Sequence, residues 1–291
     1  WTAHCDSSEH LRVKSTLLLE QIPSHLHFAT LRRDGAPVAE HLLTQDAPTW
    51  EIAGDASARS AGLRDFIALG VRHVATGVDH LVFMLALLVA ASSLRAVAGV
   101  VTGFTIGHSA TLAMAVLGGV RPDIATIEAL VGASIAVVAA ENVWLERRDP
   151  WVARGIIAGL ALVAVASAVL GRGSPIAMVG LALFVACYFG LLWRSERPAR
   201  LRWSIAALFG TVHGFAFSGA LAEMSLPRAR LASALFGFNV GVELAQLALV
   251  ALAWPLWQLV ARTPARPRVL VLASAAALSA GAFWLIDRTF G

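Results

Sequence analysis

Five ionisable side chains lie inside stretches of this chain that are otherwise apolar enough to cross a lipid bilayer. A charge or an imidazole at membrane depth is costly unless it is paired, hydrated or bound to a metal, so such residues point to function. Imidazoles and carboxylates together can ligate a divalent transition-metal ion or relay protons. The five residues are Asp79, His80, His108, His213 and Glu243.

All five residues are expected at one depth in the membrane. Each lies about 11–14 residues into its own apolar stretch, which a helical rise of about 1.5 Å per residue converts to roughly 16–21 Å from the surface where that stretch enters. This level is near the middle of a hydrocarbon core about 30 Å thick. A single membrane histidine is often only a packed, hydrogen-bonded residue, but several polar residues at one level favour a shared site over a purely structural network.

His73 and Asp79 extend the pattern around His80. His73 precedes His80 by seven residues, two helical turns along the same face, and is interpreted as an outer approach for the ion. Asp79 is turned about 100° from His80 around a helix, so it is expected to support a neighbouring imidazole.

Three further polar residues are secondary candidates for the path. Asn239 lies one helical turn before Glu243 on the same face. Glu128 lies near one end of its apolar stretch and is interpreted either as a gate for the ion or as a residue at the membrane interface. Glu141 lies near the other end of that stretch and is expected to pair with an arginine of the loop that follows it.

Small residues accompany the polar ones. Helices whose faces carry two small residues four positions apart can approach each other closely in a membrane. One such pair also occurs in a stretch without ionisable residues near its centre, so the motif alone does not mark a site. The pairs are Gly103 and Gly107, Gly210 and Gly214, Gly237 and Gly241 and, away from the polar residues, Gly155 and Gly159.

Composition identifies a membrane protein. The 291 residues are 57% apolar and only 14% charged, whereas a soluble domain is about 25% charged. The net charge of +4 comes from arginines placed between apolar stretches. That placement fits membrane topology rather than nucleic-acid binding, so the expected partner is the lipid bilayer.

The apolar stretches predict an all-α polytopic membrane helix bundle of about eight spans over residues 61–291. Each stretch is about 20 residues long, which suffices to cross the hydrocarbon core. The two shortest stretches are joined by only three residues and are expected to form a tight hairpin. The predicted spans are 66–92, 96–118, 123–145, 153–171, 174–193, 202–223, 231–261 and 268–288.

Residues 1–60 form a second, different region. Alternating apolar and polar residues at 25–31, followed by Asp34-Gly35, predict a small β-rich segment that ends in a linker at 54–60. Cys5 and Cys187 lie far apart with no CxxC motif, which argues against a disulfide framework or a thiolate metal cluster. The start at Trp1 is expected of a product whose signal peptide has been removed.

The arginines also predict orientation. With the N-terminus outside, the loops assigned to the cytoplasm hold eleven arginines and the outer loops and C-terminus hold five. Positive residues favour the cytoplasmic side. We therefore expect an integral protein of a bacterial inner membrane with both termini outside and the N-terminal segment in the periplasm.

Several motifs resemble those of the HupE/UreJ family, in its larger branch with an extracytoplasmic domain. His73-Val-Ala-Thr-Gly-Val-Asp-His80 resembles that family's H-x5-D-H motif. Further segments similar to the family occur in order at 104–112, 137–142, 209–214 and 238–243, and the run at 212–218 differs from the hydrogenase-linked members in lacking a second histidine. The resemblance implies a nickel-type permease whose metal path is lined by His73, Asp79, His80, His108, His213 and Glu243.

The leading hypothesis is therefore a permease for a divalent transition-metal ion rather than an enzyme. Imidazole and carboxylate ligands suit Ni, Co, Zn, Fe or Mn, and the lack of a nearby cysteine argues against Cu(I). Two alternatives stay open, an intramembrane zinc-dependent hydrolase and a haem-binding or proton-relay subunit of a membrane complex. The sequence is compatible with a homo-oligomer or with a larger membrane complex.

Overall fold

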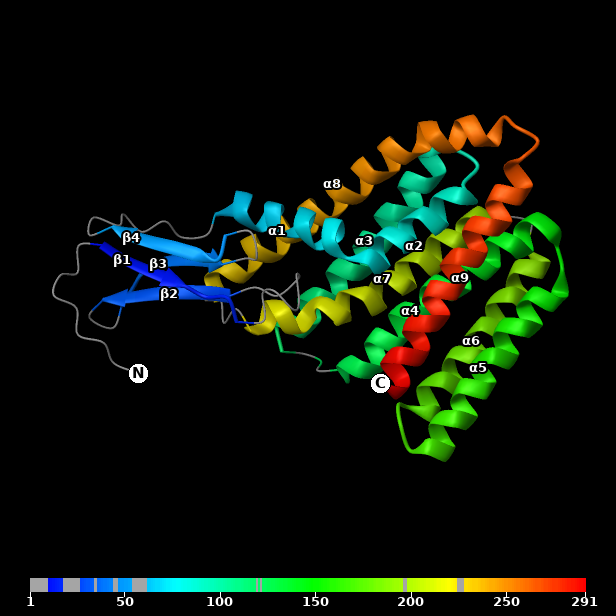
Figure 1. Cartoon of the computed structure of the whole chain (residues 1–291), viewed down its shortest axis with the longest axis horizontal. Coiled ribbons are helices and arrows are strands. Elements are labelled where there is room, and N and C mark those ends of the chain that lie inside the picture. The colour runs from blue at the N-terminus through cyan, green and yellow to red at the C-terminus, as the bar shows by residue number, and fades with distance from the viewer. Residues whose placement is uncertain are drawn as a thin grey trace.

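The computed structural model describes residues 10–17, 27–33, 36–43, 47–53, 62–118, 120, 122–195, 198–223 and 228–291. Within this part a small β-region precedes a bundle of helices. The strands lie at one end of the molecule, beyond the beginnings of α1 and α8 (Figure 1). This arrangement confirms the predicted fold class, an all-α membrane bundle with a small β-rich N-terminal segment.

Four short strands make two antiparallel pairs. β1 (His10–Lys14) pairs with β4 (Thr49–Ala53), and β2 (His27–Arg33) pairs with β3 (Ala36–Leu43). The register of the second pair shifts between Leu31 and Arg32. The predicted turn at Asp34-Gly35 and the linker at 54–60 lie outside the described residues.

The helices follow from residue 63 onward. They are α1 (Leu63–Thr76), α2 (Val78–Val89), α3 (Leu94–Val116), α4 (Ile124–Arg147), α5 (Pro150–Leu170), α6 (Pro175–Arg194), α7 (Pro198–Glu223), α8 (Arg228–Ala261) and α9 (Arg266–Phe290). Each predicted span corresponds to one of these helices, except the first, which corresponds to α1 and α2 together.

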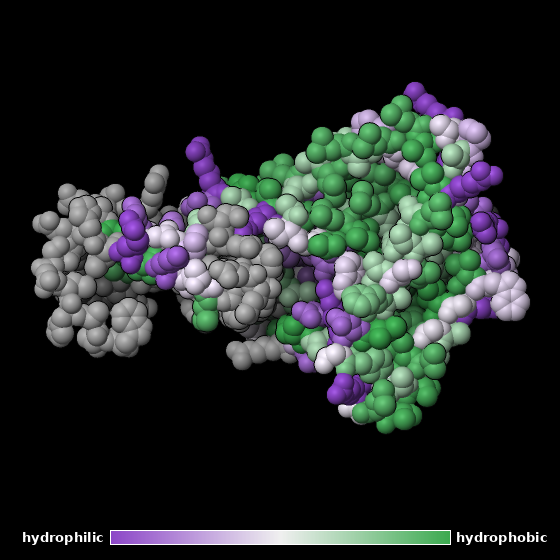
Figure 2. All heavy atoms as spheres, in the orientation of Figure 1, coloured by the Kyte–Doolittle hydropathy of each residue, from purple (hydrophilic) through white to green (hydrophobic). Residues whose placement is uncertain are grey.

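The sequence predicted about eight spans, and a criterion of helix length and apolar composition selects somewhat fewer helices. In the described part six helices are long and apolar enough to cross a membrane, or seven if α1 and α2 count as one bent span. α7 is not among them, and its sequence carries Arg200 and Arg202 near one end and His213 in the middle. Apolar side chains nevertheless cover most of the visible face of the helical part, as expected for contact with lipid (Figure 2).

The predicted span 66–92 is not one continuous helix, because the chain bends by 74° between α1 and α2. Gly77 ends α1, with its N–H bonded to the His73 carbonyl, and also precedes the first turn of α2. A Cβ at this position would crowd the His73 carbonyl oxygen and the His80 ring. The Asp79 carboxylate then accepts the backbone N–H of His80 at 2.9 Å, which favours a new helix start.

The bundle is built from three closely packed helix pairs, α3 with α7, α4 with α9 and α1 with α8. Glycines allow the closest approach. A side chain on Gly107 would overlap the backbone of α7, and one on Gly210 or Gly214 would overlap the backbone of α3. The α5–α6 hairpin stands to one side of the bundle (Figure 1), and both Gly155 and Gly159 of α5 face open space.

Two glycine substitutions should therefore differ sharply in effect. Gly210→Leu forces α7 away from the Phe104 carbonyl region of α3, and we expect a large loss of thermal stability and of monodisperse protein in detergent. Gly155→Leu adds the same side chain to an open face and should leave both unchanged. Thermal unfolding and size-exclusion profiles of the two variants check this, and equal loss in both would contradict the packing argument.

Candidate metal centre

Four histidines from four helices meet in the helical bundle. They are His73 of α1, His80 of α2, His108 of α3 and His213 of α7, called here the four-histidine cluster. The ring centroid of His80 lies 4.6 Å from that of His73, 5.1 Å from that of His213 and 6.4 Å from that of His108. His80 is thus the central ring, and the predicted convergence of helices is present in the structure.

Three of these rings could hold a metal ion together. One ring nitrogen from each of His73, His80 and His108 lies within 4.8 Å of the others. The Nε2 atom of each of these rings is buried and has no hydrogen-bond partner among the described residues. A buried polar atom left unpaired is costly, so three such atoms in neighbouring rings indicate a site that can bind a ligand.

The other ring nitrogens are held by polar side chains. Asp79 Oδ1 lies 3.0 Å from His80 Nδ1, and Asn239 Oδ1 lies 3.3 Å from His108 Nδ1. Ser134 of α4 lies 3.0 Å from His213 Nε2. Such outer partners fix the orientation and tautomer of ligating imidazoles.

The expected role of Asp79 needs correction. On one continuous helix it would point away from His80, toward a neighbouring ring. Because α2 begins anew at this position, Asp79 folds back onto its own sequence neighbour and contacts both the backbone and the ring of His80. His73 also differs from the predicted outer approach, since its ring contacts His80 directly across the break at Gly77.

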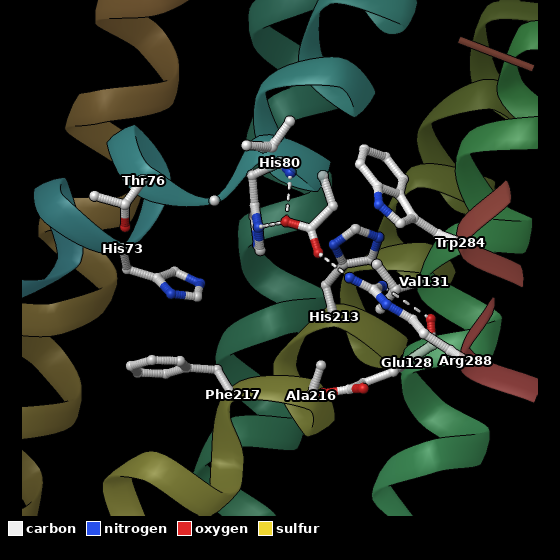
Figure 3. A pocket seen from close by; sticks show the side chains of 13 residues that line it. His73, Thr76, His80, Glu128, Val131, His213, Ala216, Phe217, Trp284 and Arg288 are labelled. Carbon is white, nitrogen blue, oxygen red and sulfur yellow. Dashed lines mark hydrogen bonds and ion pairs between the residues drawn. The ribbon is translucent and has the colours of Figure 1, made fainter. Parts of the chain in front are cut away.

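A cavity of about 330 Å³ adjoins the cluster (Figure 3). His73, His80 and His213 line it, and Phe217 and Trp284 supply apolar walls. The ring of Phe217 packs against that of His73, with 4.1 Å between centroids and an angle of 48° between the ring planes. The cluster therefore borders a space large enough to hold a hydrated ion.

Arg288 of α9 also lines this cavity and was not a predicted site residue. Its guanidinium lies 3.5 Å from Asp79 Oδ2 and donates to the Glu128 carbonyl at 3.1 Å. Glu128, predicted as a gate or an interfacial residue, lies on the cavity wall. Neither Arg288 nor Ser134 had a local sequence signal, because only the packing of α4 and α9 brings them to the histidines.

Glu243 lies apart from the cavity. Its Oε1 accepts a hydrogen bond from Thr102 at 2.7 Å, while Oε2 is buried without a partner among the described residues. It neither lines the cavity nor belongs to the group of ligand atoms around His80. Gln246, one turn further on, accepts from Thr105 at 2.9 Å, so polar contacts continue between α3 and α8.

Glu141 is a structural partner rather than a helix-end carboxylate. Its side chain is only 2% exposed, and Oε1 lies 2.8 Å from Nε of Arg202 on α7. Arg202 also donates to the Ala90 carbonyl at the end of α2. The expected pairing with the loop that follows α4 was wrong, because α7 packs against α4 and supplies a buried arginine at that level.

Comparison with known proteins adds one finding. A family model described as HupE / UreJ protein matches residues 51–177 and 176–288, which together cover most of the chain. Searches of curated proteins and of solved structures found no match.

Proposed function

The chain belongs to the HupE/UreJ family, and on that premise we propose that it moves a divalent transition-metal ion, nickel- or cobalt-like, across the membrane through the four-histidine cluster. One observation carries the proposal. Three neighbouring imidazoles, two buried and that of His73 partly buried, each offer a ring nitrogen within 4.8 Å of the others, and each has a buried Nε2 atom without a hydrogen-bond partner among the described residues. His73 and His80 also line the cavity. Imidazole ligands suit Ni, Co and Zn, and among the described residues no cysteine lines the cavity to favour Cu(I).

The spacing of the nitrogens is compatible with an ion. Two imidazole nitrogens bound to one metal at about 2.1 Å lie about 3.4 Å apart in tetrahedral geometry. The three ligand atoms of the cluster lie within 4.8 Å of one another, so only small side-chain shifts are needed to bring them to an ion. Loose ligation suits a carrier, which must release the ion as well as bind it.

Each surrounding residue has a role in this proposal. Asp79 orients His80 so that Nε2 faces the ion, and Asn239 does the same for His108. Histidines must be deprotonated to ligate, so binding displaces protons and weakens in acid. Glu243 is proposed to serve the path between α3 and α8, beyond the cluster, rather than as a ligand within it.

The orientation and the N-terminal region complete the proposal. Arginines are more numerous in the loops assigned to the cytoplasm than in the outer loops, which supports an inner-membrane protein with both termini outside. Residues 1–60 would then be a periplasmic domain and residues 61–291 the transport domain.

Reconstitution tests the function directly. Purified full-length protein in liposomes that enclose a metal-sensitive dye should admit Ni²⁺ or Co²⁺ faster than protein-free liposomes do. Metal analysis and an absorption spectrum of the same sample test the alternatives. Tightly held zinc without flux would support an intramembrane hydrolase, and a Soret band would support haem binding; either result without flux would overturn the proposal.

A further inference from the structure

Arg288 brings a permanent positive charge into the cavity that leads to the four-histidine cluster. Its guanidinium lies 3.5 Å from Asp79 Oδ2, while the other oxygen of that carboxylate holds His80. Figure 3 shows the guanidinium beside His213 and directed at the Asp79 carboxylate. A path that serves only to attract cations has no electrostatic reason to place an arginine there, since like charges repel strongly where water is scarce.

The carboxylate explains part of this placement. Asp79 is only 21% exposed at its side chain, and a carboxylate at membrane depth is costly without a counter-charge. Arg288 supplies that counter-charge when the cluster holds no ion. A divalent ion on the neighbouring imidazoles would then compete with Arg288 for the same carboxylate and would also be repelled by it.

We propose that Arg288 is a tethered cation that shares Asp79 with the transported ion and weakens the cluster's hold on it, so that the ion can leave. This inference rests on the proposed function. Arg288 acts through Asp79 and through its charge, not as a ligand, and is therefore a positioning residue. A cluster without this charge would bind its ion more tightly and release it more slowly.

A purely structural role for Arg288 makes a different prediction. Arg288 donates to the Glu128 carbonyl and so ties α9 to α4. Arg172 provides a matched control, because it donates to the Phe290 carbonyl at the same end of α9 but does not line the cavity. If anchoring of α9 were the whole role, loss of either arginine would act through stability alone.

The test compares Arg288→Gln, Arg288→Met, Arg288→Lys and Arg172→Gln in the full-length protein. Co²⁺ affinity is measured by calorimetry in detergent, Co²⁺ flux in liposomes and thermal stability in detergent. The neutral Arg288 variants should bind Co²⁺ on the order of tenfold more tightly and show slower flux at saturating Co²⁺. Arg288→Lys keeps the charge and should stay near wild type in affinity, as should Arg172→Gln.

The outcomes separate the two proposals. Unchanged or weaker Co²⁺ affinity in whichever neutral variant folds would overturn the role of Arg288 while leaving transport intact. Tighter binding in Arg172→Gln as well would also overturn it, because that charge lies outside the cavity. A wild-type protein that neither binds nor moves Co²⁺ or Ni²⁺ would overturn the proposed function, and this inference with it.

Discussion

Replacing His80 by alanine should abolish metal binding and transport. His80 is the central ring of the four-histidine cluster, and its loss removes one of the three ligand atoms that lie within 4.8 Å of one another. Loss of an outer partner of a metal ligand commonly costs 10–100-fold in affinity, so loss of the ligand itself should cost more than about 100-fold. Calorimetry with Ni²⁺ or Co²⁺, together with liposome flux, measures this effect.

A histidine outside the bundle provides the control. His41 of β3 stacks on Trp50 of β4, with 5.5 Å between ring centroids, and has no contact with the cluster. His41→Ala should therefore leave ion affinity and flux at wild-type values. Residual flux above one tenth of wild type in a folded His80→Ala protein would show that the ion does not pass through the cluster.

Replacing Glu141 by leucine should strongly destabilise the bundle without touching the cavity. The substitution leaves the Arg202 guanidinium, whose side chain is only 12% exposed, without its carboxylate. Breaking a buried ion pair by removing one partner typically costs about 3–5 kcal/mol in the free energy of unfolding. Denaturant titration of the detergent-solubilised protein should show this loss.

The double variant Glu141→Leu with Arg202→Met separates pairing from packing. Replacing both members of a buried pair with apolar residues of similar volume is often nearly neutral. We therefore expect the double variant to regain most of the stability that Glu141→Leu loses. A double variant as unstable as the single one would mean that the glutamate contributes through other contacts, and the assigned role of the pair would be wrong.

The first span shows where sequence reasoning fell short. The apolar run 66–92 is long enough to span the membrane. Its length and hydropathy reflect only its composition, and they do not show where the helix changes direction. The bend arises at a single glycine, where α1 ends and the Asp79 carboxylate helps to start α2. Gly77 and Asp79 are visible in the sequence, but their joint effect depends on the space that His73 and His80 leave around the glycine.

Glu243 and Arg288 also show what the sequence could not predict. Glu243 was expected beside the histidines and lies apart from them, whereas Arg288 was not expected there and lies beside Asp79. Equal depth suggested that Glu243 would join the histidines, but depth does not fix rotation about the helix axis, and the side chain turns to Thr102 instead. Arg288 counted in the sequence only toward membrane orientation. Its position beside Asp79 follows from the packing of α9 against α4 and α2, which pairs segments more than 100 residues apart.

The sequence by itself determined that the chain is a membrane protein and where most of its helices lie, and it predicted that His80, His108 and His213 share one depth, because hydropathy and helical rise depend only on the order of residues along the chain. Only the tertiary structure decided which side chains face each other. Rotation of each helix, the break at Gly77 and the glycine contacts between α3 and α7 are set by packing between distant segments. Those contacts bring four separate histidines together in one cluster and place Arg288 beside Asp79, which no local sequence pattern predicted.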